Sequence, residues 1–576
     1  MTSTPHPSST RPTRLLAWLS FLLVTWGLSG CSALFSSGDA TPTPIPTLEP
    51  PKLDSVGTSP ESLSITGPGA LAVYRMDVSL DWEGQRAQVA QTVEIVNPGP
   101  DFWDRIVFYL PRALQDEDRF ILSSVKVEQT TPQTVAPNIA ITENGFMTVS
   151  LADPIKPNQG AIIRIRYDLE AERTISIARR PLGDVGWNEQ IIQFHEWYPR
   201  LTPYIPSKGW VYWEPTQAGP PVYAEVADYD LQITVPEEIV VASGGPVGRE
   251  GNTWKFQLEN ARSVAFTASP DYIVDTFEQS GVQISLYRLP GTDEQAVTLR
   301  EVIANTLALY ISRFGEYPYK QLVVAQNVYT SNYATGGFIS QTGRGIEEYT
   351  GSTKELMYVM IPLSMGELYW GQIVGGNVIL EPWVMQSLAM YSEYLYDEYY
   401  LANQTDWYWE SRINYWQPEG ALNRTLYAFA TSEQYYRNIP RIGATFIHEL
   451  RLLVGDAAFY SFLRDLNAVG ASRIISERDF FAVLQRHTNQ PLSGILNEYF
   501  DSSIVPPTPL PSITPVPTAG PSPTPTPPII YVLGKLETLS DVAWRFGVTI
   551  RALQEINGLE DDEPVYEGQQ LIIPAP

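Results

Sequence analysis

The sequence predicts a multidomain α+β protein with an N-terminal antiparallel β domain, a mainly helical domain and a small C-terminal module. Three observations lead to this prediction. Apolar residues alternate in the first part of the chain and recur at helical spacing from about residue 292. Two segments rich in Pro, Thr and Ser, within residues 32–61 and 504–528, have the composition of linkers. With 576 residues, 44% of them hydrophobic, the chain can bury several cores.

The first 31 residues have the order of a secretory signal. Arg11 and Arg14 precede an apolar run, Leu15–Leu28, and small residues follow. The run ends in LSGC, which resembles the lipobox of a bacterial lipoprotein. The resemblance implies an exported protein whose Cys31, the single cysteine of the chain, carries a diacylglyceryl group. This would anchor it to a bacterial membrane, exposed to the cell wall or extracellular side; an uncleaved membrane anchor with an incidental cysteine is the alternative.

The charge of the chain argues against nucleic acid as a partner. Lys and Arg total 38 against 64 Asp and Glu, a formal net charge of -26. A surface this acidic repels phosphate backbones.

Residues 62–290 are predicted to form the β domain. In Tyr74–Trp82, every second residue is apolar, which is typical of a half-buried strand. The same alternation predicts strands in three further stretches: Ile163–Leu169, Tyr229–Val235 and Trp254–Leu258.

Residues 291–503 are predicted to be mainly helical. Arg300–Gly315 repeats apolar residues at helical spacing and stops at a glycine. Similar patterns predict helices over about 361–372, 383–403, 440–454 and 477–487.

A zinc peptidase of the HExxH type needs two imidazoles one helical turn apart and a glutamate between them. The chain has four histidines, and no two of them have that spacing. In HELRL, His448 is followed by Leu452 where the second ligand would stand. We therefore interpret His448 as a helix-surface or partly packed histidine.

Several motifs nevertheless resemble the gluzincin aminopeptidase family, over about residues 65–503. The motifs are FGEYPYKQLVVAQ (314–326), the Gly336–Gly337 pair, EPWVMQSLAMYSEYL (381–395), EWYP (196–199) and SGG (243–245). The resemblance implies an N-terminal saddle-like β domain followed by a thermolysin-like helical domain.

The family's metal-binding frame falls on LSMGELYWG, residues 363–371. If Leu363 takes the place of the first histidine, Ser364 takes that of the general base and Glu367 that of the second histidine. Gln386 then stands where the family has its third ligand, a glutamate. The resemblance thus implies an intact frame with a degenerate centre, and we expect no metal, no cofactor and no zinc hydrolysis.

The substrate-binding motif of the family is altered as well. Its Met and Glu positions correspond to Phe338 and Ile339 in GGFIS, and the oxyanion tyrosine falls near Pro440, with Tyr435 and Tyr436 close by. The alternative is a zinc metallopeptidase that uses non-standard ligands. Glu367 and Gln386 are expected to hydrogen bond to each other or to a tyrosine.

Without zinc, the former cleft is hypothesised to bind a peptide or an envelope protein, or the domain serves as a structural spacer. The aromatic residues that suggest a binding surface also fit a core: Tyr358, Tyr369, Trp370 and Trp383.

Residues 529–576 predict a strand, two helices and a second strand. IYVL and QLIIP are short strands, and Thr538 and Thr549 can cap the two helices. The first helix carries Leu539, Val542, Ala543 and Phe546, and the second carries Leu553 and Ile556.

This module resembles the LysM family. The matching residues are Tyr531, Val532, the stretches 537–539 and 546–548, Leu553, Asn557, Gly568, Gln569, Leu571, Ile572 and Pro574, whereas Leu536 replaces a glycine of the family's turn. The resemblance implies binding of peptidoglycan or another N-acetylglucosamine glycan. It places six residues in the groove, each of which can also be a cap, core or turn residue: Glu537, Thr538, Leu539, Asn557, Gly558 and Leu559.

Overall fold

The protein is described here by a computed structural model. It describes residues 71–129, 137–174, 185–214, 216, 223–328, 332–501, 529–533, 539–546, 550–559, 565–566 and 568–573. The expected leader with Cys31, and both Pro-rich linkers, lie outside the described residues.

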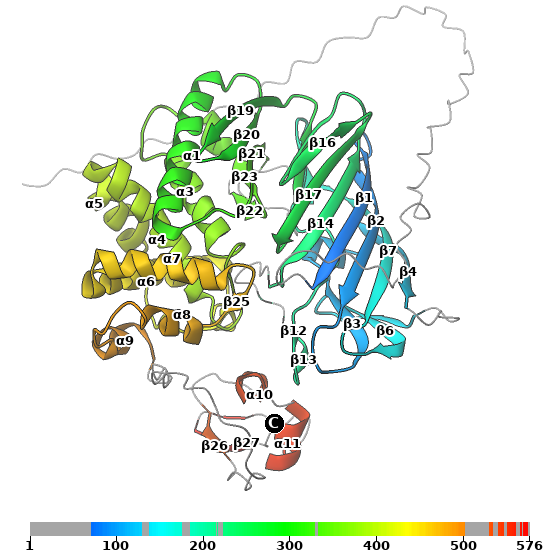
Figure 1. The fold of residues 1–576 in the computed structure, drawn as a ribbon, viewed down its shortest axis with the longest axis vertical. Coiled ribbons are helices and arrows are strands. Elements are labelled where there is room, and N and C mark those ends of the chain that lie inside the picture. Colours follow the sequence, from blue (N-terminus) through cyan, green and yellow to red (C-terminus); the bar gives the residue numbers. More distant parts are fainter. Residues whose placement is uncertain are drawn as a thin grey trace, which may run out of the picture. The chain divides into compact units, whose positions relative to one another are not determined.

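A seven-stranded sheet dominates the first part of the chain (Figure 1). In its strand β1 (Ala72–Asp81), Met76, Val78 and Leu80 are buried and the residues between them are partly exposed. This alternation suits a strand with one face on the core. The strand order is β16-β17-β14-β1-β2-β7-β4. The other six strands are β2 (Arg86–Val96), β4 (Phe120–Glu128), β7 (Gly160–Glu170), β14 (Ala227–Thr234), β16 (Pro246–Glu250) and β17 (Thr253–Ala261).

The alternating stretches of the sequence are strands of this sheet, as predicted. Neighbouring strands run antiparallel, except that β1 pairs in parallel with β14, with Val73 opposite Asp228. Strands this far apart in sequence are not constrained by a hairpin, so either direction is open to them.

Smaller sheets complete the β domain. Their orders are β15-β18-β10-β9-β8, β11-β3-β6-β5 and β12-β13. Their strands, with one 3-10 turn, are β3 (Trp103–Tyr109), η3 (Arg112–Gln115), β5 (Ile139–Ile141), β6 (Phe146–Ile155), β8 (Glu172–Arg173), β9 (Val185–Trp187), β10 (Ile192–Phe194), β11 (Arg200–Leu201), β12 (Tyr204–Ile205), β13 (Gly209–Trp210), β15 (Val240–Ser243) and β18 (Phe266–Ser269).

A further five-stranded sheet, β19-β20-β21-β23-β22, straddles residues 290 and 291. Its strands are β19 (Ile273–Gln279), β20 (Val282–Arg288), β21 (Gln321–Asn327), β22 (Tyr333–Thr335) and β23 (Phe338–Thr342). Because β20 pairs with β21, the strands before residue 290 are continuous with the fold of the second part.

Helices make up most of the remaining second part, as predicted. Helix α1 (Asp293–Phe314) ends at Gly315, whose φ of 98° favours glycine. The others are α2 (Gly343–Glu347), α3 (Leu356–Tyr369), α4 (Trp383–Tyr400), α5 (Thr405–Trp407), α6 (Ser432–Val454), α7 (Asp456–Gly470), α8 (Glu477–Leu484) and α9 (Ser493–Tyr499). A π-helical turn, η6 (Tyr408–Ile413), follows α5, and two short strands, β24 (Gly375–Gly376) and β25 (Ile474–Ile475), pair in parallel. Within the described ranges, no helix is long and apolar enough to cross a membrane.

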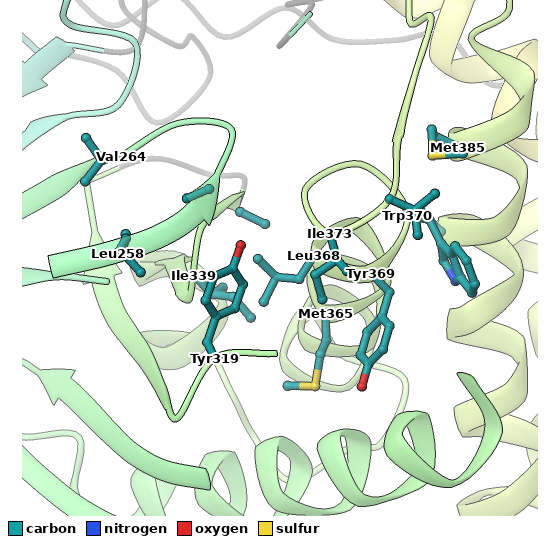
Figure 2. Packing of buried hydrophobic residues seen from close by; sticks show 14 of the residues in the cluster. Leu258, Val264, Tyr319, Ile339, Met365, Leu368, Tyr369, Trp370, Ile373 and Met385 are labelled. Carbon is teal, nitrogen blue, oxygen red and sulfur yellow. The ribbon is translucent and has the colours of Figure 1, made fainter. Parts of the chain in front are cut away.

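One hydrophobic core joins the β domain to the helical part. Leu258 of β17 belongs to this core, and Figure 2 shows Ile339 of β23 close to Leu368 and Ile373, at and after the end of α3. Met365 and Tyr369 of α3 extend the same cluster.

Buried polar contacts also link the two parts. Glu196 accepts hydrogen bonds from Arg200 at 2.8 Å and from the Tyr333 hydroxyl at 2.5 Å. The His195 ring stacks on Tyr333, and its Nε2 lies 2.9 Å from Ser340 Oγ. Because all five side chains are buried, each polar group needs such a partner.

The C-terminal module has the predicted order of elements. Strand β26 (Ile529–Val532) pairs antiparallel with β27 (Gln570–Ile573), and α10 (Leu539–Phe546) and α11 (Ile550–Asn557) lie between them in sequence. Val542, Ala543 and Leu553 are buried in its core, whereas Ile556 is 44% exposed.

Candidate functional site

The metal-ligand frame predicted from the sequence lies on α3. Leu363 and Glu367, one helical turn apart, are both partly exposed, while Ser364, Met365 and Gly366 between them are buried. The two histidine positions of the resemblance therefore share one accessible face of the helix. That face carries an aliphatic side chain and a carboxylate.

Helix α4 supplies the third position and packs closely against α3. A Cβ added at Gly366 would lie 2.9 Å from the Ala389 carbonyl oxygen and 3.0 Å from Ser392 Cβ. The Tyr310 hydroxyl contacts the carbonyl oxygens of Pro362 and Ser392, at 2.9 and 2.7 Å. These contacts set the helices antiparallel, and the partly exposed Gln386 stands three residues before Ala389.

These residues do not fit a catalytic zinc ion. A leucine has no lone pair to donate, and a neutral amide is a weak substitute for a carboxylate ligand. Ser364, at the base position, has its hydroxyl oxygen buried without a hydrogen-bond partner among the described residues. Across the described part of the chain, no cluster of three or more His, Cys, Asp or Glu side chains is arranged to hold a metal.

The residue that the resemblance places at the substrate-amine position is part of the core. Ile339 is fully buried in β23, where it pairs with Val324 and Ala334. Figure 2 shows its side chain among apolar neighbours that include Tyr319 and Leu368. Phe338 is buried as well. A peptide amine has no access to either residue.

A tyrosine does lie near the frame. Burial, then Tyr436 and then the Glu367 carboxylate raise the pKa of Tyr435 well above its ordinary value. Tyr435 and Pro440 both belong to α6. The Tyr435 phenol therefore stays protonated, and a hydrogen bond between Glu367 and a tyrosine or Gln386 stays a prediction.

The aromatic residues suggested as a binding surface are mostly core. Tyr369, Trp370 and Trp383 are at most 1% exposed, and Tyr358 alone is partly exposed. Of the two interpretations, core fits Tyr369, Trp370 and Trp383, which are buried in α3, at its end and in α4; peptide binding in the cleft stays a hypothesis. Helical spacing in a sequence does not distinguish an aromatic core stripe from a binding stripe.

His448 is a packed histidine, as interpreted from the sequence. Its Nδ1 lies 3.0 Å from the Tyr391 hydroxyl, and its ring packs among Tyr394 and Trp409. Burial, then the charge of Arg451, lower its pKa. Leu452, one turn further on, is 70% exposed.

In the C-terminal module, Glu537 and Thr538 lie outside the described residues. Asn557 is held by the backbone: its Nδ2 donates to the Leu553 and Ile572 carbonyls, both at 2.8 Å, and its Oδ1 accepts from the Ile572 N–H at 2.6 Å. Leu539 and Leu559 pack against the core of the module, and Gly558 is exposed with a φ of 66°. These four residues thus have structural roles of their own.

Comparison with known proteins gives different matches for the C-terminal module and for the rest of the chain. Residues 531–574 match the model of the LysM domain. No curated protein matches the chain.

Solved structures resemble the larger part. An M1 zinc metallopeptidase from Deinococcus radiodurans shares 18% sequence identity, with a TM-score of 0.53 over 78% of this chain and 98% of that one. A variant of that enzyme bound to a Tyr-Ser-Ala substrate has 18% identity and a TM-score of 0.55, over 77% and 97%. A two-domain M1 zinc metallopeptidase variant bound to L-tryptophan has 17% identity and a TM-score of 0.53, over 79% and 100%. The chain therefore carries a C-terminal LysM domain and a body with a fold similar to that of M1 zinc metallopeptidases.

Proposed function

We propose that this protein is a lipid-anchored envelope protein that binds peptidoglycan, or another N-acetylglucosamine glycan, through its LysM domain. Its peptidase-like body holds a peptide or protein segment without hydrolysing it. The observation that carries the proposal is that Leu363, Ser364, Glu367 and Gln386, which the resemblance places at the peptidase centre, lie on α3 and α4 and supply no set of zinc ligands among the described residues.

The glycan-binding part is supported by the LysM match over residues 531–574. Leu539, Gly558 and Leu559 are partly or fully exposed, as a groove for a neutral sugar requires. Such recognition uses hydrogen bonds and apolar sugar faces, so the acidity of the chain does not oppose it.

The non-hydrolytic part is supported by five positions at once. A zinc peptidase needs ligands, a base and a substrate anchor together. Here an aliphatic residue, a buried serine and a buried isoleucine occupy three of these roles. One lost ligand is replaceable by water, but the loss of all five functions is not.

Export and lipid attachment complete the proposal. They are supported by the sequence order of Arg14, the apolar run and LSGC at residues 28–31. A diacylglyceryl anchor at Cys31 and a glycan-binding domain at the other end would connect a membrane to the cell wall.

The glycan-binding part is tested with residues 32–576 and insoluble peptidoglycan in a sedimentation assay. The chain is expected in the pellet, and soluble N-acetylglucosamine oligomers should release it. A chain ending at residue 503 is the control and should stay in the supernatant. A full chain that also stays in the supernatant would refute glycan binding.

The non-hydrolytic part is tested by zinc content and peptidase activity on the same protein. After dialysis against trace zinc, elemental analysis should find no more metal than in an inert protein, and aminoacyl substrates should remain intact. Stoichiometric zinc with hydrolysis would favour the alternative, a metallopeptidase with non-standard ligands around Glu367.

A further inference from the structure

A pocket opens at the start of α3, beside the degenerate centre. Its volume is about 390 Å³, within the range of small-ligand sites. The lining comes from four segments: Arg344, Gly345, Glu348 and Tyr349; Lys354, Glu355 and Leu356; Val359; Trp407 and Arg412. Val359 lies one turn before Leu363 on the same face of α3, so the pocket continues the stripe on which the metal ligands would stand.

More basic than acidic side chains line this pocket, whereas the chain as a whole is acidic. Three basic side chains and two carboxylates line it, although the whole chain has 38 basic and 64 acidic residues. A local excess of positive charge in so acidic a protein would concentrate an anion at this point.

Of the two carboxylates, only Glu348 is paired with a cation, and the pair with Arg344 at 2.6 Å leaves no net charge. Glu355 accepts a hydrogen bond from the Thr350 N–H at 2.8 Å and also contacts the Thr350 hydroxyl. Lys354, in contrast, has no ion-pair partner among the described residues; it lies 5.9 Å from the centre of the Trp407 ring.

Arg412 lies in the wall of the pocket, and Glu393 compensates its charge. It pairs bidentately with the buried Glu393 at 2.6 and 2.8 Å. Burial, then the neighbouring Glu393, raise the pKa of Asp397 to about 8, so Asp397 is mostly neutral at pH 7. Arg441 is close enough to Arg412 for their charges to repel. Arg441 Nε also donates to the Arg412 carbonyl oxygen at 2.8 Å, so two guanidinium groups lie near the Glu393 carboxylate.

We infer that this pocket binds the carboxylate of an acidic peptide, with Lys354 as the principal cation and Trp407, Leu356 and Val359 against the apolar part of the residue. The inference rests on the proposed function, because it assigns the class of peptide that the non-hydrolytic body holds. The remainder of the peptide would follow α3 past Leu363 toward Glu367.

The test uses the full chain from residue 32 and two probes, acetyl-Ala-Glu-Ala-amide and acetyl-Ala-Gln-Ala-amide, in isothermal titration calorimetry. The Glu peptide should bind more tightly than the Gln peptide, and added salt should weaken it. Lys354→Gln should reduce affinity for the Glu peptide about tenfold, the effect of losing one charge-assisted hydrogen bond. Lys126→Gln, at an exposed lysine of β4, is the matched control and should bind as the native chain does.

Equal affinity for the two peptides, or unchanged affinity in Lys354→Gln, would overturn the carboxylate site and leave peptide binding by the body intact. If neither peptide binds at millimolar concentration, the site and the peptide-binding part of the proposed function fall together. Sedimentation with peptidoglycan reports on the LysM domain separately in each case.

Discussion

Gly244 lies directly against the backbone of Gly336: a Cβ at residue 244 would stand 2.0 Å from the Gly336 carbonyl oxygen. The contact joins two motifs of the family resemblance, SGG in the β domain and GGFIS before and within β23. Gly336 is itself enclosed, since a Cβ there would lie 2.7 Å from that of Ala261. The two motifs are thus parts of one packing arrangement that positions β23.

Gly244→Ala should destabilise the protein by about 1–3 kcal/mol, because a backbone oxygen cannot move aside as a flexible side chain can. Thermal unfolding followed by circular dichroism measures the effect. Gly494→Ala is the control, because a Cβ at this position in α9 would have nothing within 4 Å. If the unfolding temperature fell equally little in both variants, the backbone around Gly336 would have moved to accommodate the new Cβ.

Glu381 should make stability depend on pH. Burial, then the Glu477 carboxylate, raise its pKa from 4.5 to about 7. The folded protein therefore holds this proton more tightly than the unfolded chain does. The stabilisation is fully present below pH 4.5, is lost as pH rises through 7 and amounts to at most about 3 kcal/mol.

Glu381→Gln removes this titration while leaving an oxygen that can accept the Glu477 N–H, bonded at 2.8 Å in the native protein. Denaturant unfolding at pH 5 and pH 8 should show a smaller loss of stability in the variant than in the native chain. The difference between the two proteins isolates Glu381 from Asp397, which titrates in the same range and direction. Identical pH profiles would mean that Glu381 ionises normally.

Sequence analysis identified strands with one face exposed and helices with apolar residues at helical spacing. Strand β1 alternates, and α1 ends at a glycine, so both follow from local patterns. Strand β21 was not predicted because six of its seven residues are buried and it shows no alternation. Short buried runs of this kind resemble buried helices as much as strands.

Part of the candidate site could be predicted from the sequence, and part could not. The positions on α3 and α4 followed from fixed spacing along the chain, a local property. The pocket at Lys354 and Trp407 did not, because its lining residues are up to 68 positions apart, from Arg344 to Arg412, and meet only through tertiary packing. The burial of Tyr369 and Trp370 is likewise set by neighbouring helices.

Restoring the ligands should restore zinc binding. Leu363→His, Glu367→His and Gln386→Glu together place two imidazoles one turn apart on α3 and a carboxylate on α4. All three positions are partly exposed, so polar side chains there remain hydrated. Elemental analysis after dialysis should find close to one zinc per chain, and cobalt substitution should give a visible absorption band.

Leu363→His alone is the control and should bind no more zinc than the native protein. The triple variant should still fail to hydrolyse peptides, because Ser364 and Ile339 remain at the base and substrate positions. If the triple variant bound no more zinc than the native protein, the alignment of these three residues with the family's metal ligands would be wrong.

Asn557→Ala should destabilise the LysM domain instead of removing a sugar contact. The side chain joins the end of α11 to β27 through hydrogen bonds to both the N–H and the carbonyl of Ile572, and alanine leaves these groups to water. The expected cost is about 1–3 kcal/mol, visible by scanning calorimetry of the full chain as an earlier transition of the domain. At temperatures well below that transition, the variant should sediment with peptidoglycan as the native chain does.

Ile556→Ala, at an exposed neighbour on the same helix, is the control and should leave both measurements unchanged. Native stability combined with lost sedimentation in Asn557→Ala would instead make Asn557 a direct glycan contact, as the LysM resemblance implies.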